Sequence, residues 1–385
     1  MIKYNYYNII DFGLSRIRVA IFDTNLKVCF SESISNSLIQ NSENTFVNLK
    51  NLIKKAEKKI SSHIEDIILI FDSKQTLVID VSLQKQLHEG ADFAKAYESL
   101  SKEICQIIAD NYREYEIIHT IFNRGIFDEK IFNTLPENIK SLKQIKIDYK
   151  IICFPKKSIQ NIKKNFNKNN LNITKIFCTS FLKTQTYINK LNLNKVSFLD
   201  IGYERSSLII YDNKKLKYIR SINIGSNNIT KDISKIFKID LEDAEKIKKS
   251  FNKSDTEFSY DNNLINDDLT AREIIDKNIS IDLLKKVILY RVQEIFDLTF
   301  KQFENRSNST KDNQLFLIGN GSILFKNNSF DLIDNFGFKK INFFSETDIQ
   351  VCGSALSFFL AKKDKPEKYQ KKQGLFEKFF NFFSR

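Results

Sequence analysis

The stretch VSFLDIG, residues Val196–Gly202, is a short apolar run that ends in Asp-x-Gly. A turn, a second apolar run at Ser207–Tyr211, another turn and a third run at Leu216–Ile224 follow it. Short runs of branched and aromatic residues separated by turn residues are typical of neighbouring antiparallel strands. The segment therefore predicts three strands, with Asp200 and Gly202 at the first turn.

The beginning of the chain has the same order of features. Tyr7–Asp11 is apolar, Gly13 allows a turn, and strand patterns follow at Ile17–Asp23 and Val28–Ser33. One pattern that occurs twice, about half the chain apart, indicates a duplicated domain. The alternative is a pair of unrelated hairpins, since hairpins are common.

The rest of the chain mixes helical and strand patterns. Apolar residues at helical spacing predict helices at 49–60, 93–112, 157–169, 180–191, 229–237, 241–249, 281–303 and 348–361. Compact apolar runs predict further strands at 67–71, 116–122, 147–154, 173–177 and 315–318. The sequence therefore predicts an α/β protein.

Composition excludes several classes of protein. The 385 residues carry a formal net charge of +13 but no nucleic-acid motif, so we expect anionic lipid or acidic peptide partners and no nucleic acid. The five cysteines form no CxxC pair and, with three histidines, give no zinc-site spacing, which favours buried apolar cysteines over catalytic thiols. No signal-peptide core and no stretch of ~20 apolar residues is present, which predicts a cytoplasmic protein with peripheral membrane contact.

Three glycine-bearing turns could bind phosphate: Asp11–Arg16, Asp200–Ser206 and Gly319–Ser322. Glycine lets backbone N–H groups approach phosphate oxygens, and an aspartate at a strand end can hold a hydrated Mg²⁺. Each turn alone is a weak signal, because Asp-x-Gly also occurs in ordinary hairpins. Two such turns facing one another would form a nucleotide clamp.

The order of these features resembles the actin, Hsp70 and sugar-kinase superfamily, and within it the FtsA family. The segment INIGSNNITKDI (Ile222–Ile233) is similar to the FtsA segment after the second hairpin, and LEDAEKIK (Leu241–Lys248) is similar to its Asp-Ala-Glu-x-x-Lys helix. YRVQEIF (Tyr290–Phe296) and residues 147–182 are also FtsA-like. The similarity covers most of the chain, and is patchy before residue 147.

The resemblance implies a duplicated actin-like (ribonuclease H-like) ATPase fold with an FtsA-type inserted subdomain and a C-terminal amphipathic helix. It implies subdomain 1A at 1–80 and 161–195 with part of 345–361, the inserted subdomain 1C at 81–160, 2A at 196–225 and 306–344, and 2B at 226–305. A linker at 362–373 and a membrane-targeting helix at 374–385 complete this expected organisation.

The resemblance also implies ATP and Mg²⁺ as cofactors. Asp11 and Asp200 would hold the metal through water. The expected nucleotide-binding residues are Asp11, Gly13, Ser15, Arg16, Asp200, Gly202, Glu245, Lys248, Gly319 and Gly321. The alternative for Glu245 and Lys248 is an ordinary solvated helix face.

Some positions depart from the family pattern. The second phosphate turn, normally close to Gly-Gly-Gly-Thr, is Gly202–Ser206 with the sequence GYERS. The Glu204 carboxylate would repel phosphate and Tyr203 would hinder backbone approach, while Arg16 replaces a usual Lys and Asn320 a usual Gly. These departures predict weaker ATP binding and weak or absent ATPase activity.

The C-terminal segment 374–385, GLFEKFFNFFSR, has the spacing of an amphipathic helix. One face carries the expected membrane-binding residues Leu375, Phe376, Phe379, Phe380 and Phe383. A lipid interface would bury this face and attract the lysine-rich linker before it. The alternative is a helix docked on the protein's own core.

The resemblance implies a cell-division adaptor that binds ATP and tethers FtsZ to the cytoplasmic face of the inner membrane at the division site. The acidic C-terminal peptide of FtsZ would contact subdomain 2B, with Lys285, Lys286 and Arg291 as candidates, and the chain would self-associate into actin-like filaments. Each candidate could instead lie on a solvated helix face. The alternatives are a PilM-like pilus-assembly scaffold and a small-molecule kinase of the same superfold.

Overall fold

The computed structural model describes most of the chain. The described residues are 6–13, 15–35, 42–73, 75–88, 92–135, 143–191, 193–250, 279–304, 314–325, 338, 340–344 and 347–363. Among them, no helix is both long and apolar enough to cross a bilayer. The expected linker from 364 onwards and the expected membrane helix at 374–385 lie outside the described residues.

The first half of the fold is a five-stranded sheet in the order β3-β2-β1-β4-β9. Its strands are β1 (Tyr6–Phe12), β2 (Arg16–Asp23), β3 (Val28–Ser35), β4 (Asp66–Phe71) and β9 (Asn172–Cys178). Strands β1 and β3 both run antiparallel to β2 between them, while β4 runs parallel to β1 and β9 parallel to β4. The buried strand β4 reads as a continuous apolar run because both of its faces are covered.

The second half repeats this sheet, in the order β12-β11-β10-β13-β14. Its strands are β10 (Lys195–Ile201), β11 (Ser206–Asp212), β12 (Lys215–Ile222), β13 (Gln314–Ile318) and β14 (Lys340–Phe343). Strand directions match those of the first sheet position by position. The predicted duplicated α/β fold is thus confirmed.

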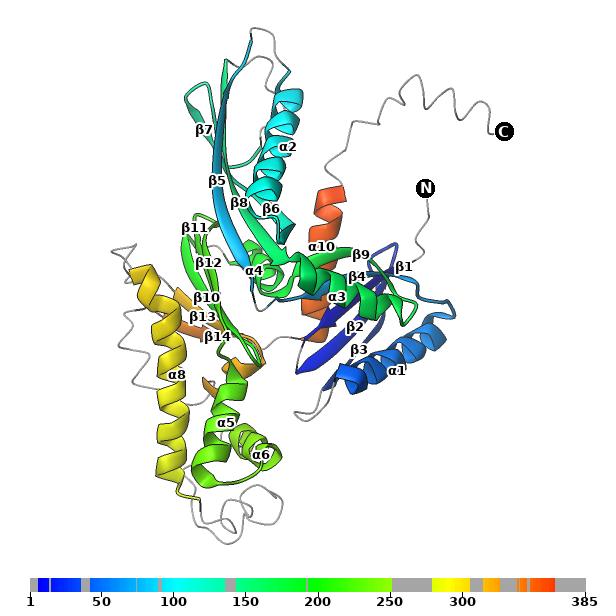
Figure 1. The fold of residues 1–385 in the computed structure, drawn as a ribbon, viewed down its shortest axis with the longest axis vertical. Helices are drawn as coiled ribbons and strands as arrows, with labels where there is room; N and C mark the ends of the chain where they lie inside the picture. The colour runs from blue at the N-terminus through cyan, green and yellow to red at the C-terminus, as the bar shows by residue number, and fades with distance from the viewer. Residues whose placement is uncertain are drawn as a thin grey trace.

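Helix α4 (Thr179–Lys190) lies between the two sheets, at the centre of the molecule (Figure 1). Its buried side chains Phe181, Leu182 and Ile188 belong to one hydrophobic core that includes strands of both sheets. Helix α10 (Asp348–Lys363) packs against α4 and the first sheet, whose other covering helices are α1 (Ser42–Ile60) and α3 (Lys156–Asn167). Because α4 contacts both halves, it fixes the geometry of the cleft between them.

A third sheet, in the order β5-β8-β6-β7, is inserted in the chain between β4 and β9. It consists of β5 (Leu77–Gln86), β6 (Tyr115–Phe127), β7 (Lys130–Phe132) and β8 (Gln144–Pro155), with α2 (Phe93–Asn111) on one face. Leu100, Ile104 and Ile108 of α2 pack into a separate core with this sheet. Figure 1 shows the unit projecting from the rest of the molecule.

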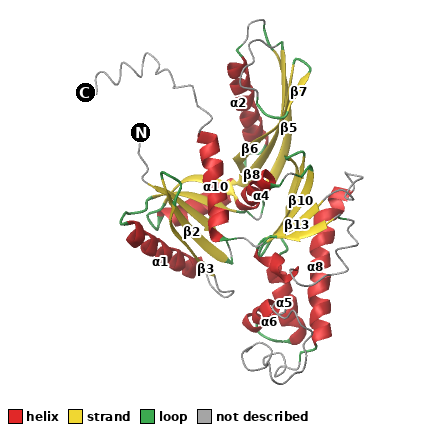
Figure 2. Ribbon diagram, turned by 180° about the vertical axis from the view of Figure 1, so that it is seen from behind, coloured by secondary structure: helices red, strands yellow, loops and turns green. Residues whose placement is uncertain are grey.

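Helices α5 (Ser226–Phe237), α6 (Leu241–Ser250) and α8 (Ile281–Glu304) cover the second sheet and extend beyond it, as Figure 2 shows from behind. They share a core with the strands β10, β11 and β13. A short 3-10 helix, η1 (Asn320–Phe325), follows β13 and lies against β10. This arrangement brings the start of α5 and the end of β13 to the same edge as the first turn of the second sheet.

Several element bounds differ from the sequence prediction. Helix α5 begins at Ser226 rather than at 229, because the Ser226 and Asn227 N–H groups donate to the carbonyls of Gly202 and Tyr203. Helix α1 begins at Ser42 rather than at 49. Strand β5 was not predicted, since Asp80, Lys85 and several other polar residues interrupt its apolar pattern.

Candidate nucleotide cleft

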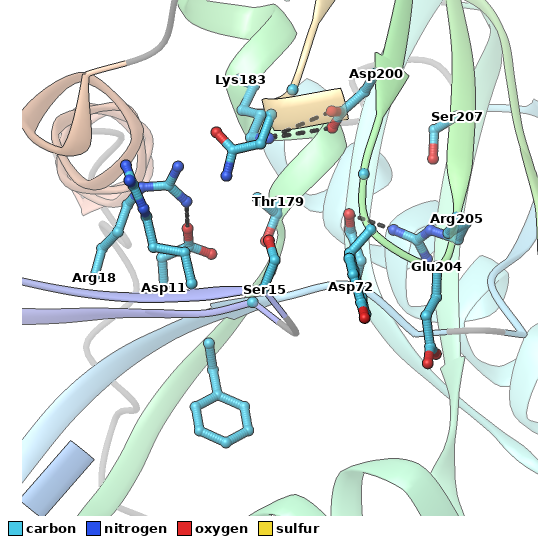
Figure 3. A pocket seen from close by; sticks show the side chains of 17 residues that line it. Asp11, Ser15, Arg18, Asp72, Thr179, Lys183, Asp200, Glu204, Arg205 and Ser207 are labelled. Atoms are coloured by element: carbon cyan, nitrogen blue, oxygen red, sulfur yellow. Dashed lines mark hydrogen bonds and ion pairs between the residues drawn. The ribbon is translucent and has the colours of Figure 1, made fainter. Parts of the chain in front are cut away.

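A cleft lies where the first turns of the two sheets face one another (Figure 3). Seven of the predicted nucleotide-binding residues line it: Asp11, Gly13, Ser15, Arg16, Asp200, Gly202 and Gly319. Other lining side chains come from the end of β4 (Asp72) and from α4 (Thr179 and Lys183). Residues far apart in the sequence thus meet at one polar site, as the duplicated pattern predicted.

Glycine is required at the two facing turns by close backbone contacts. A Cβ on Gly13 would lie 2.7 Å from the Arg16 carbonyl oxygen, and a Cβ on Gly202 would lie 2.9 Å from the Arg205 carbonyl oxygen. In the second turn the Gly202 N–H donates to that same carbonyl at 2.8 Å. The two turns are therefore built in the same way.

Gly319 closes the cleft from the end of β13. Its φ of 87° lies in the left-handed region that favours glycine. A Cβ at this position would come within 2.3 Å of Asp200 Oδ1 and 2.6 Å of the Ile201 carbonyl oxygen. A side chain at Gly319 would thus displace Asp200, which links the third glycine turn to the predicted phosphate site.

Both predicted metal-binding aspartates are ion-paired with a buried cation. Arg18 Nη1 donates to Asp11 Oδ2 at 2.6 Å, and the two side chains are 5% and 3% exposed. Lys183 Nζ lies 3.4 Å from each carboxylate oxygen of Asp200, and these side chains are 10% and 7% exposed. The carboxylates therefore face the cleft with their charge already balanced.

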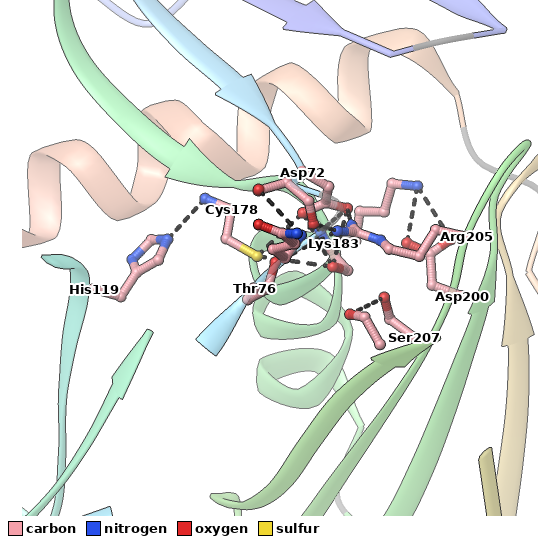
Figure 4. A network of polar contacts seen from close by, with 12 residues as sticks. Asp72, Thr76, His119, Cys178, Lys183, Asp200, Arg205 and Ser207 are labelled. Atoms are coloured by element: carbon pink, nitrogen blue, oxygen red, sulfur yellow. Dashed lines mark hydrogen bonds and ion pairs between the residues drawn. The ribbon is translucent and has the colours of Figure 1, made fainter. Parts of the chain in front are cut away.

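A third ion pair bridges the two halves across the cleft (Figure 4). Arg205, which precedes β11, pairs with Asp72 at the end of β4 and donates to the Ser73 carbonyl. The Ser180 hydroxyl also donates to Asp72, at 3.0 Å, and the Cys178 thiol lies 3.1 Å from it. Burial raises the pKa of the Asp72 carboxyl, but the Arg205 guanidinium and the hydrogen bonds more than offset this, so its pKa lies below the ordinary value.

Sequence analysis did not single out Asp72, Lys183 or Arg18. Arg205 was considered only as part of the second phosphate turn. One signal was available for Asp72, because the carboxyl ends of parallel strands in α/β sheets commonly line ligand sites and Asp72 follows the buried run 67–71. Another was available for Arg18, which pairs directly with Asp11 in the β1–β2 hairpin.

The ion pairs leave a cavity volume of about 130 Å³ in the cleft. Ligand pockets usually measure roughly 300–1,000 Å³. Tyr203 and Glu204, the two residues predicted to hinder phosphate binding, both line the cleft. In Figure 3 the Glu204 carboxylate points away from Asp200. The cavity between the two halves is therefore smaller than a usual ligand pocket.

Glu245 and Lys248 are not among the residues that line the cleft. The Lys248 ammonium donates to Thr230 Oγ1 at 2.7 Å and to the Ser226 carbonyl at 3.1 Å, and the Thr230 hydroxyl donates to Glu245 at 2.6 Å. Burial lowers the pKa of the Lys248 ammonium. Burial raises the pKa of the Glu245 carboxyl, but the adjacent Lys248 ammonium outweighs this effect, so the pKa of Glu245 lies below its ordinary value. This cluster joins α6 to the start of α5 rather than forming the solvated face considered as the alternative.

Gly321 also lies beside the cleft rather than in its lining. A Cβ there would come within 2.7 Å of the Ile201 side chain and 3.0 Å of Ser226 Cβ. Gly321 thus allows the turn after β13 to pack against the strand that carries Asp200.

The three residues predicted to contact FtsZ lie on α8. Lys285 and Lys286 are exposed. Arg291 is half-buried, and its guanidinium contacts both Asp232 oxygens on α5, at 2.6 and 3.0 Å, as well as Glu294. The predicted membrane-binding residues Leu375, Phe376, Phe379, Phe380 and Phe383 lie outside the described residues.

Comparisons with known proteins agree with this arrangement. Residues 197–340 match the family model described as "Cell division protein FtsA". The cell division protein FtsA of Staphylococcus epidermidis strain RP62A is 22% identical over 331 residues, covering 83% of this chain and 70% of that protein. FtsA of a second strain, ATCC 12228, is also 22% identical, over 335 residues, with the same shares covered.

Among solved structures, the PilM–PilN type IV pilus biogenesis complex is similar with a TM-score of 0.57, at 13% identity, covering 90% of this chain and 89% of that one. At this identity the likeness concerns the fold alone. The chain therefore has the actin-like ATPase fold, and its predicted resemblance to the cell-division protein FtsA is confirmed.

Proposed function

We propose that this chain is an FtsA-like cell-division adaptor that binds ATP, attaches to the membrane and holds FtsZ there. The observation that carries the proposal is the match of residues 197–340 to the FtsA family model, because this segment includes the second phosphate turn and the helices α5, α6 and α8. The two facing glycine turns support the ATP site. We expect weak or absent hydrolysis, because the second turn carries Tyr203 and Glu204.

The membrane part of the proposal rests on residues 374–385, whose spacing would place five of the six apolar residues on one face of a helix. Burial of each Phe side chain stabilises the bound state by roughly 1.5–3 kcal/mol, which offsets the cost of ordering a short helix. The net charge of +13 favours anionic lipids. The expected place is the cytoplasmic face of the inner membrane at the division site, where the chain would form actin-like filaments.

The proposed FtsZ contact lies on the outer face of α8. Tyr290 is 72% exposed and lies one helical turn after the exposed Lys286, while Leu283 is also exposed. Basic and apolar side chains together suit an acidic peptide that also carries apolar residues. Arg291 contributes to the packing of α8 on α5, so Lys285 and Lys286 are the stronger candidates for direct contact.

Binding of a labelled FtsZ C-terminal peptide tests this contact. We expect Lys285→Glu/Lys286→Glu to weaken binding by about tenfold or more, a change of about 1.4 kcal/mol. Lys301→Glu, at the other end of the same helix, is the matched control and should bind as the unaltered chain does. Equal binding by the double variant would exclude this face as the FtsZ contact.

The two alternatives have less support. The likeness to PilM is one of fold and gives no reason to prefer pilus assembly. A small-molecule kinase would need a catalytic base and a substrate pocket in the cleft, and no sequence pattern indicated either.

A further inference from the structure

The chain places its own positive charge beside both candidate metal-binding aspartates. Arg18 reaches Asp11 from the neighbouring strand of the same hairpin, where the two residues are directly paired. Lys183 reaches Asp200 from α4, the helix between the two sheets. Figure 3 shows both cations pointing to their carboxylates within the cleft.

The residue paired with the aspartate differs between the two hairpins. Ser207 pairs with Asp200 in the β10–β11 hairpin, as Arg18 pairs with Asp11 in the β1–β2 hairpin. The Ser207 hydroxyl bonds to the Ser221 hydroxyl at 2.8 Å and supplies no charge. A cation from a different element, Lys183, takes that role, so Asp11 and Asp200 each have a buried cation as partner.

These residues offer a divalent cation little unshared carboxylate charge. Mg²⁺ requires oxygen ligands in near-octahedral geometry and is held in such sites by carboxylates, waters and substrate phosphates. Asp11 and Asp200 instead each pair with a buried cation, so a metal ion bound directly to either carboxylate would share it with Arg18 or Lys183. A buried cation left without its carboxylate is strongly unfavourable.

We propose that this cleft binds the polyphosphate of a nucleoside triphosphate without a divalent cation, with Arg18 and Lys183 supplying the positive charge that Mg²⁺ would otherwise provide. The inference rests on the proposed ATP binding and specifies its chemistry. Guanidinium has five donors and ammonium three, so each group can keep its carboxylate and still donate to a phosphate oxygen. Arg16 adds a further cation to the cleft lining.

Calorimetric titration of the full chain with ATP, in excess Mg²⁺ and in excess EDTA, tests the inference. We expect the two dissociation constants to agree within about threefold. Binding that occurs only with Mg²⁺ would overturn the inference and leave the proposed ATP site standing. No binding under either condition would overturn both the inference and the ATP part of the proposed function.

Substitution of Lys183 distinguishes the loss of its charge from a general loss of folding. In Lys183→Ala we expect ATP affinity in EDTA to fall by about tenfold or more, with Mg²⁺ restoring most of the loss. Lys183→Arg keeps the charge and should still bind ATP in EDTA, and Lys164→Ala on the exposed face of α3 is the matched control. Unchanged binding of Lys183→Ala in EDTA would overturn the inference.

Discussion

The bridge between Asp72 and Arg205 makes a quantitative prediction about the stability of the cleft. In Arg205→Ala, Asp72 loses the cation that joins the second half of the fold to the first. Removing one partner of a buried ion pair costs about 3–5 kcal/mol of unfolding free energy. The side chains are 10% and 20% exposed and Asp72 keeps its bond from Ser180, so we expect the lower end, about 3 kcal/mol.

A double-mutant cycle measures the interaction itself. Thermal and urea unfolding of Arg205→Ala, Asp72→Asn and the double variant should give a coupling energy of about 1–3 kcal/mol. Arg113→Ala, which removes an exposed arginine, is the control and should change stability by less than about 0.5 kcal/mol. Additive single effects would refute the bridge as a link between the halves.

The remaining predictions concern other contacts of the site. Gly319→Ala should destabilise the fold by more than about 1 kcal/mol and abolish ATP binding, because its Cβ would collide with Asp200; unfolding and calorimetric titration check this. Lys248→Met should lower the melting temperature, because Glu245 would lose its ammonium partner, whereas an unchanged melting temperature would contradict the structural role assigned to the pair. The folded-state pKa of Asp72 is depressed, so its contribution to stability is present above the ordinary value of 3.8 and is lost as pH falls through the lower folded-state pKa. A melting temperature recorded as a function of pH should therefore fall less steeply below pH 3.8 in Arg205→Ala than in the unaltered chain.

Local patterns predicted the repeated part of the fold well. The strands that begin each half are apolar runs bounded by glycine and polar turns, so their existence and order follow from short stretches of sequence. The duplication also predicted that Asp11 and Asp200 face one another, because equivalent turns of two related sheets lie at equivalent edges.

Long-range contacts limited the rest of the prediction. The partners of Asp72 and Asp200 lie on other elements, and no local period indicates that α4 would bring Lys183 to the cleft. Glu245 was expected near the nucleotide from the family resemblance, and its contact with Thr230 on the neighbouring helix α5 had no local sequence signal. Strand β5 was not predicted, because polar residues alternate with its apolar residues and no continuous apolar run is present.

Co-sedimentation with anionic vesicles tests whether this chain tethers FtsZ to a membrane. The full chain is compared with a chain ending at Gln373, each with FtsZ from the same organism. We expect the full chain to carry FtsZ into the vesicle pellet, while the shortened chain binds FtsZ but leaves it in the supernatant. Full-length chain and FtsZ both remaining in the supernatant would contradict the tether and leave an actin-like protein without a division role.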